Sequence, residues 1–495
     1  DPNTIASLQN IIANPFKTFS FIQREVELNA SGDLFDLPAG AIKPAVGGDS
    51  RREYQNNRVD SVSITNGPGA TCDVAQEACS SPLVGAFNVK EVYAELFIPI
   101  LKDAPGAYAL NLDLGNRYSK YNIFSGNDSS KVAIEWRPIK DLLVRGSASD
   151  IFRAPSAGNL FGGSAGGAPG FNGDPCVGAN AALLAAHPRA CGTITGIPST
   201  TVSGQTTGLF EGSILGGQNL GPEKGRSYDF GVVYDPQFVQ GLSTSFDFYR
   251  ITLNNLITQL SPNVVMNDCF HDEASPFCSL IHRQASDGGI AFFQLPVANI
   301  GTLTTDGFDF SIKYRIPVTP WGQFSVGADF THINKYDVKT DPNPLAMVET
   351  RHLAGQFDPA FGNFIKWRGN FSLDWSKGDW NAGYRMRWVG HGVIGSLDPG
   401  QNASADACNF VTNPYGICPG PVTMKIPNYF ESYFTAGYNF GHIGTMDSRV
   451  DVGVDNAFDK SPPFIWSNLA LNANTDVATY DTIGRLFWAR FTAKF

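Results

Sequence analysis

The densest group of side chains that could carry chemistry is the segment CFHDEASPFC, in which two cysteines flank a histidine and two acids. Thiolate, imidazole and carboxylate groups are common ligands of zinc. The spacing of Cys269, His271 and Cys278 matches no standard zinc pattern, however. A disulfide between Cys269 and Cys278 is therefore the favoured interpretation.

All eight cysteines fall into local pairs of this kind, and none is left over. The pairs are Cys72 with Cys79, Cys176 with Cys191, Cys269 with Cys278, and Cys408 with Cys418. Each pair lies in a polar stretch that contains Gly or Pro, as expected of loops that are pinned in an oxidising compartment. The sequence predicts four loop disulfides, in the periplasm or at the cell surface.

No arrangement of residues indicates catalysis. The seven histidines are scattered without a metalloprotease or triad context, and the glycine-rich run that begins at Gly162 lacks the strand and helix that flank a phosphate-binding loop. The net charge of -10 argues against a nucleic-acid partner. We expect neither an enzyme nor a resident cofactor or metal.

The composition points to a membrane protein built from strands. Of 495 residues, 42% are hydrophobic and only 17% are charged, which indicates extensive apolar surface outside a core. No run of 18 apolar residues occurs, so a helical span is excluded. A transmembrane β-barrel is not excluded, because its lipid face uses only every second residue.

Alternation with period two supports the barrel. In the segment 88–100, Val92, Ala94 and Leu96 fall on one face, while Glu91 and Glu95 fall on the other. We count about fifteen such strands. Their ranges are about 18–32, 40–58, 86–101, 106–120, 127–137, 141–152, 224–236, 241–258, 302–316, 321–336, 362–376, 379–395, 428–440, 446–456 and 482–495.

Short and long connections alternate between these strands. The long ones span about 59–85, 153–223, 259–301, 337–361, 396–427 and 457–481, and residues 1–17 read as an incomplete outer loop. Outer-membrane barrels have short periplasmic turns and long extracellular loops, so all four cysteine pairs are assigned to the outside. An even-stranded barrel with a periplasmic C-terminus needs at least one strand before the first of these fifteen, so we expect the chain to be incomplete.

Several segments, in order, resemble the barrels of proteobacterial TonB-dependent receptors, which import scarce nutrients across the Gram-negative outer membrane. They include NVKEVYAELFIPIL, KVAIEWRPIKDLLVRGSASDIFRAPSAGNLF, VDNAFDKSPP and YDTIGRLFWARFTAKF. The resemblance covers roughly residues 18–495. It implies an all-β antiparallel barrel of about 22 strands, of which the eighth to the last are present. The N-terminal plug domain, the segment that binds TonB and about seven strands have no counterpart in this sequence.

The resemblance implies TonB-coupled import of a siderophore, an oligosaccharide or a similar solute, with outer-membrane lipid, a plug and the TonB complex as partners. A passive porin and a structural surface protein that binds a lipoprotein or another envelope partner are the alternatives. In the last strand, Phe491 and Phe495 are expected to form the barrel-assembly signal, or simply to face lipid.

Residues that could face the solute come from the loops and the lumen. Each has a plainer interpretation: Arg153 could merely fix the end of a strand, loop aromatics could pack against one another, and inward arginines could pair with acids. The candidates are Arg153, Phe161, Phe171, Phe292, Phe293, Arg385, Arg387 and Trp466.

Overall fold

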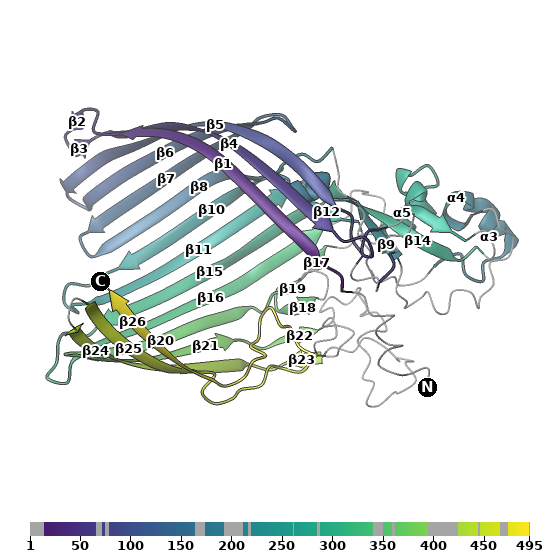
Figure 1. The fold of residues 1–495 in the computed structure, drawn as a ribbon. Coiled ribbons are helices and arrows are strands. Elements are labelled where there is room, and N and C mark those ends of the chain that lie inside the picture. The colour runs from purple at the N-terminus through teal and green to yellow at the C-terminus, as the bar shows by residue number, and fades with distance from the viewer. Residues whose placement is uncertain are drawn as a thin grey trace, which may run out of the picture.

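The computed structural model consists chiefly of one large antiparallel sheet (Figure 1). It describes residues 14–65, 72–74, 79–163, 174–192, 211–215, 219–260, 262–284, 288–339, 350–358, 362–394, 424–443, 446–465 and 474–494. The strands along the sheet are β1 (Lys17–Ser31), β4 (Lys43–Val59), β5 (Leu83–Ala104), β6 (Ala107–Tyr121), β7 (Asn127–Ile139), β8 (Leu142–Arg153), β10 (Glu223–Tyr234), β11 (Leu242–Asn254), β15 (Thr302–Arg315), β16 (Gln323–Lys339), β20 (Trp367–Lys377), β21 (Trp380–Val389), β24 (Tyr429–Ile443), β25 (Met446–Asp455) and β26 (Leu486–Lys494).

Each strand of this sheet is hydrogen-bonded to the strands that precede and follow it along the chain. This up-and-down order, together with the curvature seen in Figure 1, gives the shape of a barrel wall. Within the described residues, β1 and β26 each pair with a single neighbour, so the wall is open between them. The predicted all-β, antiparallel class is confirmed, and each of the fifteen expected segments overlaps one of these strands.

Several expected strand ends were wrong by four residues or more. The segment expected at 379–395 ends at Val389, and Gly392–Ile394 form a separate strand, β22, while the last strand begins at Leu486 and not near 482. The segment expected at 241–258 ends at Asn254, because Asn255 adopts a left-handed conformation with φ of 55° that breaks the extended chain. Residues Ile257–Gln259 form a separate loop strand, β12. The segment expected from 362 begins at Trp367, since Gly362–Asn363 form β19, which pairs with another loop strand, β18 (Gln356–Asp358).

The two faces of the sheet differ as the alternation predicts. On β5, Val92 is 60% exposed on the outward face, whereas the neighbouring Glu91 is buried on the inward face. Many large apolar side chains are exposed on the outward face, as expected of the lipid-facing side of a barrel.

Aromatic side chains form two belts on the outward face. Near the long loops, Phe308, Trp367 and Trp388 lie in one row, with ring centroids 5.6 Å and 6.4 Å apart. Near the short turns, Trp375 donates to the Trp321 carbonyl at 2.8 Å. Trp367 and Trp375 lie on one strand and are eight residues apart, or roughly 26 Å along it. Because barrel strands are tilted by about 35–45°, this length corresponds to roughly 20 Å of height, somewhat less than the apolar band of about 25 Å.

The long loops at one end of the sheet carry further structure (Figure 1). Their helices are α2 (Ala157–Phe161), α3 (Ala181–Ala186), α4 (Pro188–Cys191), α5 (Pro262–His271) and η2 (Pro276–Leu280). Their remaining strands are β9 (Glu211–Leu215), β13 (Ile281–Arg283), β14 (Ile290–Asn299), β17 (Arg351–His352), β22 (Gly392–Ile394) and β23 (Met424–Ile426). At the other end, the described residues form the β2–β3 hairpin (Asp36–Leu37 with Gly40–Ala41) and short turns. No helix in the described ranges is long and apolar enough to cross a membrane.

Candidate functional site

Charged side chains on the inward face of the sheet are paired with one another. Asp113 lies 3.0 Å from Lys131, and Arg117 lies 3.5 Å from Glu91. Further round the wall, Arg145 Nη2 lies 2.6 Å from Asp247 Oδ1. The lumen is thus polar, and these pairs neutralise part of its charge, whereas Asp229, Asp247 and Asp309 form a group of like charges beside Arg145.

Two further inward arginines, Arg385 and Arg490, also have acidic partners. Arg385 lies 3.8 Å from Asp374, and both side chains stay at least half exposed, so this contact is weak. Arg490 lies 3.3 Å from Asp451, whose carboxylate also accepts from Arg449 at 2.6 Å. These pairs agree with the plainer interpretation of the inward arginines, although Arg385 remains open to solvent.

A cavity at the loop end of β21 and β24 forms what we call the rim pocket. It is lined by Arg387, Glu431, Tyr433 and Asp455 of the sheet and by most residues between 477 and 486, Tyr480 among them, at the end of the last long loop and the start of β26. Arg387 Nη2 donates to the Thr479 carbonyl at 2.5 Å, which holds the loop against the inward face. The pocket therefore joins the lumen to the outer loops.

Buried polar groups in the rim pocket are incompletely satisfied. The Glu431 side chain is 3% exposed, yet its Oε2 makes no hydrogen bond within the described residues and faces Arg387 only at 3.6 Å. The Tyr480 hydroxyl is also buried and makes no hydrogen bond of ordinary geometry. The side chain of Asn363 is the polar group beside it. Burial raises the pKa of Tyr480, so it stays a neutral donor. Unsatisfied buried groups cost about 1–3 kcal/mol each, and they are typical of sites that bind a polar ligand or water.

Two loops that are far apart in sequence fold together as one body, which we call the two-loop cap. It comprises the described residues of the β8–β10 loop (174–192) and of the β11–β15 loop (262–300). Arg283 donates to Asp174 at 2.6 Å and to the Ala190 carbonyl at 2.8 Å, and both charged side chains are buried. The cap core includes Val265, Met266 and Phe293, which are fully buried.

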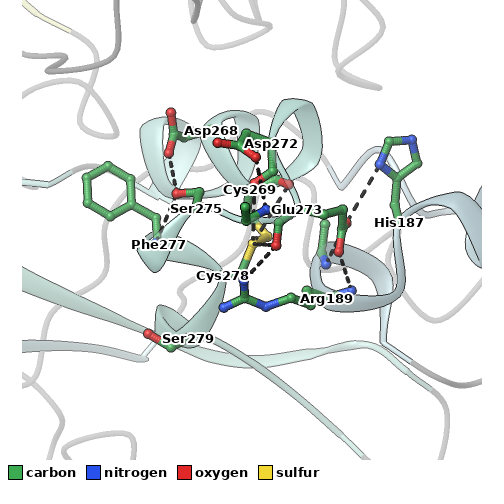
Figure 2. Close-up of a disulfide and its surroundings, with 12 residues drawn as sticks. His187, Arg189, Asp268, Cys269, Asp272, Glu273, Ser275, Phe277, Cys278 and Ser279 are labelled. Carbon is green, nitrogen blue, oxygen red and sulfur yellow. Dashed lines mark hydrogen bonds and ion pairs between the residues drawn. A yellow bond between two sulfur atoms is a disulfide. The ribbon is translucent and has the colours of Figure 1, made fainter.

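Figure 2 shows the second contact between these loops, beside the Cys269–Cys278 disulfide. The Glu273 carboxylate accepts the Arg189 main-chain N–H at 2.7 Å and the Ala190 N–H at 3.2 Å. His187 stacks on Phe270 with centroids 3.9 Å apart. A carboxylate at the start of α4 thus binds the loop that carries α5 to the loop that carries α3 and α4.

The predicted cysteine pairs are joined by disulfides where the structure describes them. These are Cys72–Cys79, Cys176–Cys191 and Cys269–Cys278. The pair Cys408–Cys418 lies outside the described residues. No free cysteine and no cluster of three metal-ligating side chains occurs in the part of the chain that is described.

Arg153 lies at the end of β8 and forms a two-pronged ion pair with Glu223. Glu223 is fully buried and also accepts the Ile257 main-chain N–H at 2.6 Å. The pair therefore ties together β8, β10 and the loop strand β12. This arrangement matches the interpretation of Arg153 as a residue that fixes the strand end.

The aromatic candidates lie in the loops, and none of those described points freely into the lumen. Phe161 packs beside the buried cluster that contains Leu160. Phe292 stacks on His282 at 4.1 Å, and Phe293 is fully buried in the cap core. Phe491 is 62% exposed on the outward face of β26. Phe171, Trp466 and Phe495 lie outside the described residues.

Residues that the sequence alone did not single out include Glu223, Glu431 and Tyr480. Each is an ordinary polar residue near the end of a strand or in a loop, so no local pattern marks it. Their importance becomes visible only when the register places each of them beside an arginine or in a cavity.

A family model described as TonB dependent receptor-like, beta-barrel, matches residues 5–457 of this chain. No curated protein sequence matches it. Among solved structures, a mutant ferric enterobactin receptor from Pseudomonas aeruginosa matches with a TM-score of 0.57 at 16% identity, covering 97% of this chain and 54% of the receptor.

The siderophore receptor PirA from Acinetobacter baumannii matches with a TM-score of 0.55 at 14% identity, covering 96% of this chain and 55% of that protein. The chain thus spans about half the length of these structures. At this identity the likeness concerns the fold.

Proposed function

The chain belongs to the TonB-dependent receptors, and from this membership we propose that it imports a scarce nutrient across the outer membrane by TonB-coupled active transport. Members of the family are outer-membrane transporters and not enzymes. The coupling to TonB and the identity of the solute are our inferences.

The rim pocket is the observation that carries the proposal. It lies where the lumen meets the outer loops, and it presents an arginine, a buried carboxylate and tyrosine hydroxyls to one cavity. A solute with hydroxyl groups could complete the hydrogen bonding of Glu431 Oε2 and of the Tyr480 hydroxyl, the two buried atoms of this pocket that lack a hydrogen bond of ordinary geometry. Binding at this position would precede passage through the lumen.

The inward face supports the same route. Its ion pairs and its carboxylates that accept from Ser311 and Thr331 give the described part of the wall a polar inner surface that can hold water. We place ferric siderophores first among candidate solutes and oligosaccharides second. The names of the structurally similar receptors support this order, and the mixture of donors, acceptors and aromatic rings suits both classes.

We further propose that residues 18–495 form the C-terminal part of a closed barrel. The open edges of β1 and β26 would leave backbone groups without partners in lipid, at a cost of several kcal/mol per group. Additional strands and a plug, from the same polypeptide or a second one, would complete the barrel and reach TonB.

Gene deletion with substrate profiling tests the proposal. The deletion strain should lose uptake of one ferric siderophore or oligosaccharide, and loss of TonB should abolish that uptake in the wild type. Uptake that persists without TonB would refute active transport. A large steady conductance of the purified protein in bilayers would instead indicate a passive pore.

A further inference from the structure

The floor of the rim pocket consists of two rows of inward side chains. They cross β20, β21 and β24, which are neighbours in the barrel wall (Figure 1). The row nearer the loops places Arg368, Val389 and Tyr429 side by side, and the next row places Arg387 beside Glu431. The polar groups of the floor are therefore held in fixed positions by the register of the sheet.

Four buried polar atoms at these rows make no hydrogen bond of ordinary geometry within the described chain. They are Arg368 Nε, Tyr429 Oη, Glu431 Oε2 and Tyr480 Oη. Tyr480 comes from the last long loop, and its ring centroid lies 5.2 Å from that of Tyr429. An ionised carboxylate can only accept hydrogen bonds, so the group of a solute that approaches Glu431 must be an N–H or an O–H.

Carboxylates outnumber cations in the lining of the rim pocket. Glu431, Asp455 and Asp481 line it, and Arg387 is the one cation among its described lining residues. The Arg387 guanidinium is already engaged, because it faces Glu431 at 3.6 Å and donates to the Thr479 carbonyl at 2.5 Å. The lining therefore carries a net negative charge, and its cation is not available to an anionic solute.

The second arginine of the floor does not change this balance. Arg368 Nη2 donates to the Asn363 carbonyl at 2.6 Å, and the Asn363 side chain donates to Asp476 at 3.0 Å. Arg368 and Asp476 add one cation and one anion to the surroundings of the pocket. The excess of carboxylates therefore stays the same.

We propose that the rim pocket selects a solute whose bound face is uncharged or cationic and carries N–H or O–H groups. Oligosaccharides and uncharged ferric hydroxamates with a peptide backbone share this chemistry. Ferric catecholates carry a net negative charge, which Glu431, Asp455 and Asp481 repel. Tyr433 and Tyr480 add hydroxyl groups and rings that suit an uncharged polar solute. This inference rests on the proposed function and names the class of solute that the same pocket takes.

Equilibrium binding to the receptor, purified from outer membranes in the form that the cell makes, tests the charge preference. The probes are the ferric complex of a cyclic hydroxamate peptide, the ferric complex of a tris-catecholate, and a neutral oligosaccharide of glucose. At least one uncharged probe should bind on the order of tenfold more tightly than the catecholate complex, and the tighter of the two identifies the source of the shared chemistry. Catecholate binding that equals or exceeds that of both uncharged probes would overturn the proposal.

Removal of the three carboxylates should reverse the preference. The variant Glu431→Gln/Asp455→Asn/Asp481→Asn should bind the catecholate complex at least about tenfold more tightly than the wild type does, because the like charges are gone. The new amides can still accept from Trp488 Nε1 and from the Ile483 main-chain N–H, as Asp455 and Asp481 do. A gain of affinity cannot result from misfolding, and an unchanged affinity would overturn the proposal.

The matched control Glu95→Gln/Asp113→Asn/Glu135→Gln removes three carboxylates from the inward face of β5, β6 and β7. It should keep the wild-type preference, and an equal gain in this control would overturn the assignment to the rim pocket. TonB-dependent uptake of the catecholate complex in preference to both uncharged probes would refute this inference and leave the proposed function intact. Uptake that persists without TonB would refute the proposed active transport but not the binding preference.

Discussion

Replacement of Arg283 by methionine should detach the two loops of the two-loop cap from each other. Arg283 is the buried cation that faces the buried Asp174, and it also donates to the carbonyls of Ala190 and Gly288 at 2.8 Å each. Methionine fills a similar volume but leaves the Asp174 carboxylate buried without its partner. Removal of one member of a buried ion pair costs about 3–5 kcal/mol.

This cost should appear as local opening and not as global unfolding, because the pair lies outside the sheet. An opening free energy lower by about 3–5 kcal/mol corresponds to exchange that is faster by roughly 10² to 10³ or more. Hydrogen exchange followed by mass spectrometry should show this acceleration in residues 174–192 and 262–284, with β10 and β11 unchanged. The double variant Arg283→Met/Asp174→Leu should recover most of the protection.

Two outcomes would refute this reasoning. Unchanged exchange in residues 174–192 would mean that the ion pair does not hold the cap together. Equal acceleration in β10 and β11 would mean that the cap and the sheet unfold as one unit.

Three further predictions concern the rim pocket, a disulfide and the last strand. Glu431→Gln should lower solute affinity by about tenfold while the protein stays folded, because a hydrogen bond to a charged acceptor contributes about 1.5–3 kcal/mol. Unchanged affinity in a binding assay would exclude the rim pocket as the solute site. Cys269→Ser/Cys278→Ser should destabilise the two-loop cap by about 2–3 kcal/mol, which limited proteolysis should detect as faster cleavage within α5. Cleavage at the wild-type rate would contradict a stabilising role of the disulfide. Phe491→Ala should lower the fraction of assembled protein, measured by heat-dependent migration on a detergent gel, more than Phe487→Ala does, although both side chains are exposed on the same face. Equal losses would favour simple lipid contact over an assembly signal.

The sheet was predictable because its signal is local. In β5, apolar Val92 and Ala94 alternate with polar Glu91 and Tyr93, and this period of two shows which face of the strand is apolar. The strand ends were less predictable. Asn255 ends β11 in a left-handed conformation, which asparagine adopts at some positions and not at others, so its presence in the sequence does not mark the end.

The candidate site could not be predicted from local signals. Arg153 and Glu223 are 70 residues apart, and only the register of β8 with β10 brings them together. The helices of the cap are also short: α5 has ten residues and α4 has four, so neither produces a clear helical period. Loop packing depends on pairs such as Arg283 and Asp174 that no single segment reveals.

The construction of the two-loop cap limits how new binding specificities can arise by recombination. Each disulfide closes within a single loop, but the polar contacts of Glu273 and Arg283 cross between the two loops. Exchange of one loop with a homologue would leave Asp174 or Arg283 buried without its partner, whereas exchange of both would carry the matched contacts along. We therefore expect the two loops to be inherited as a unit, and an engineered receptor with new specificity should graft them together.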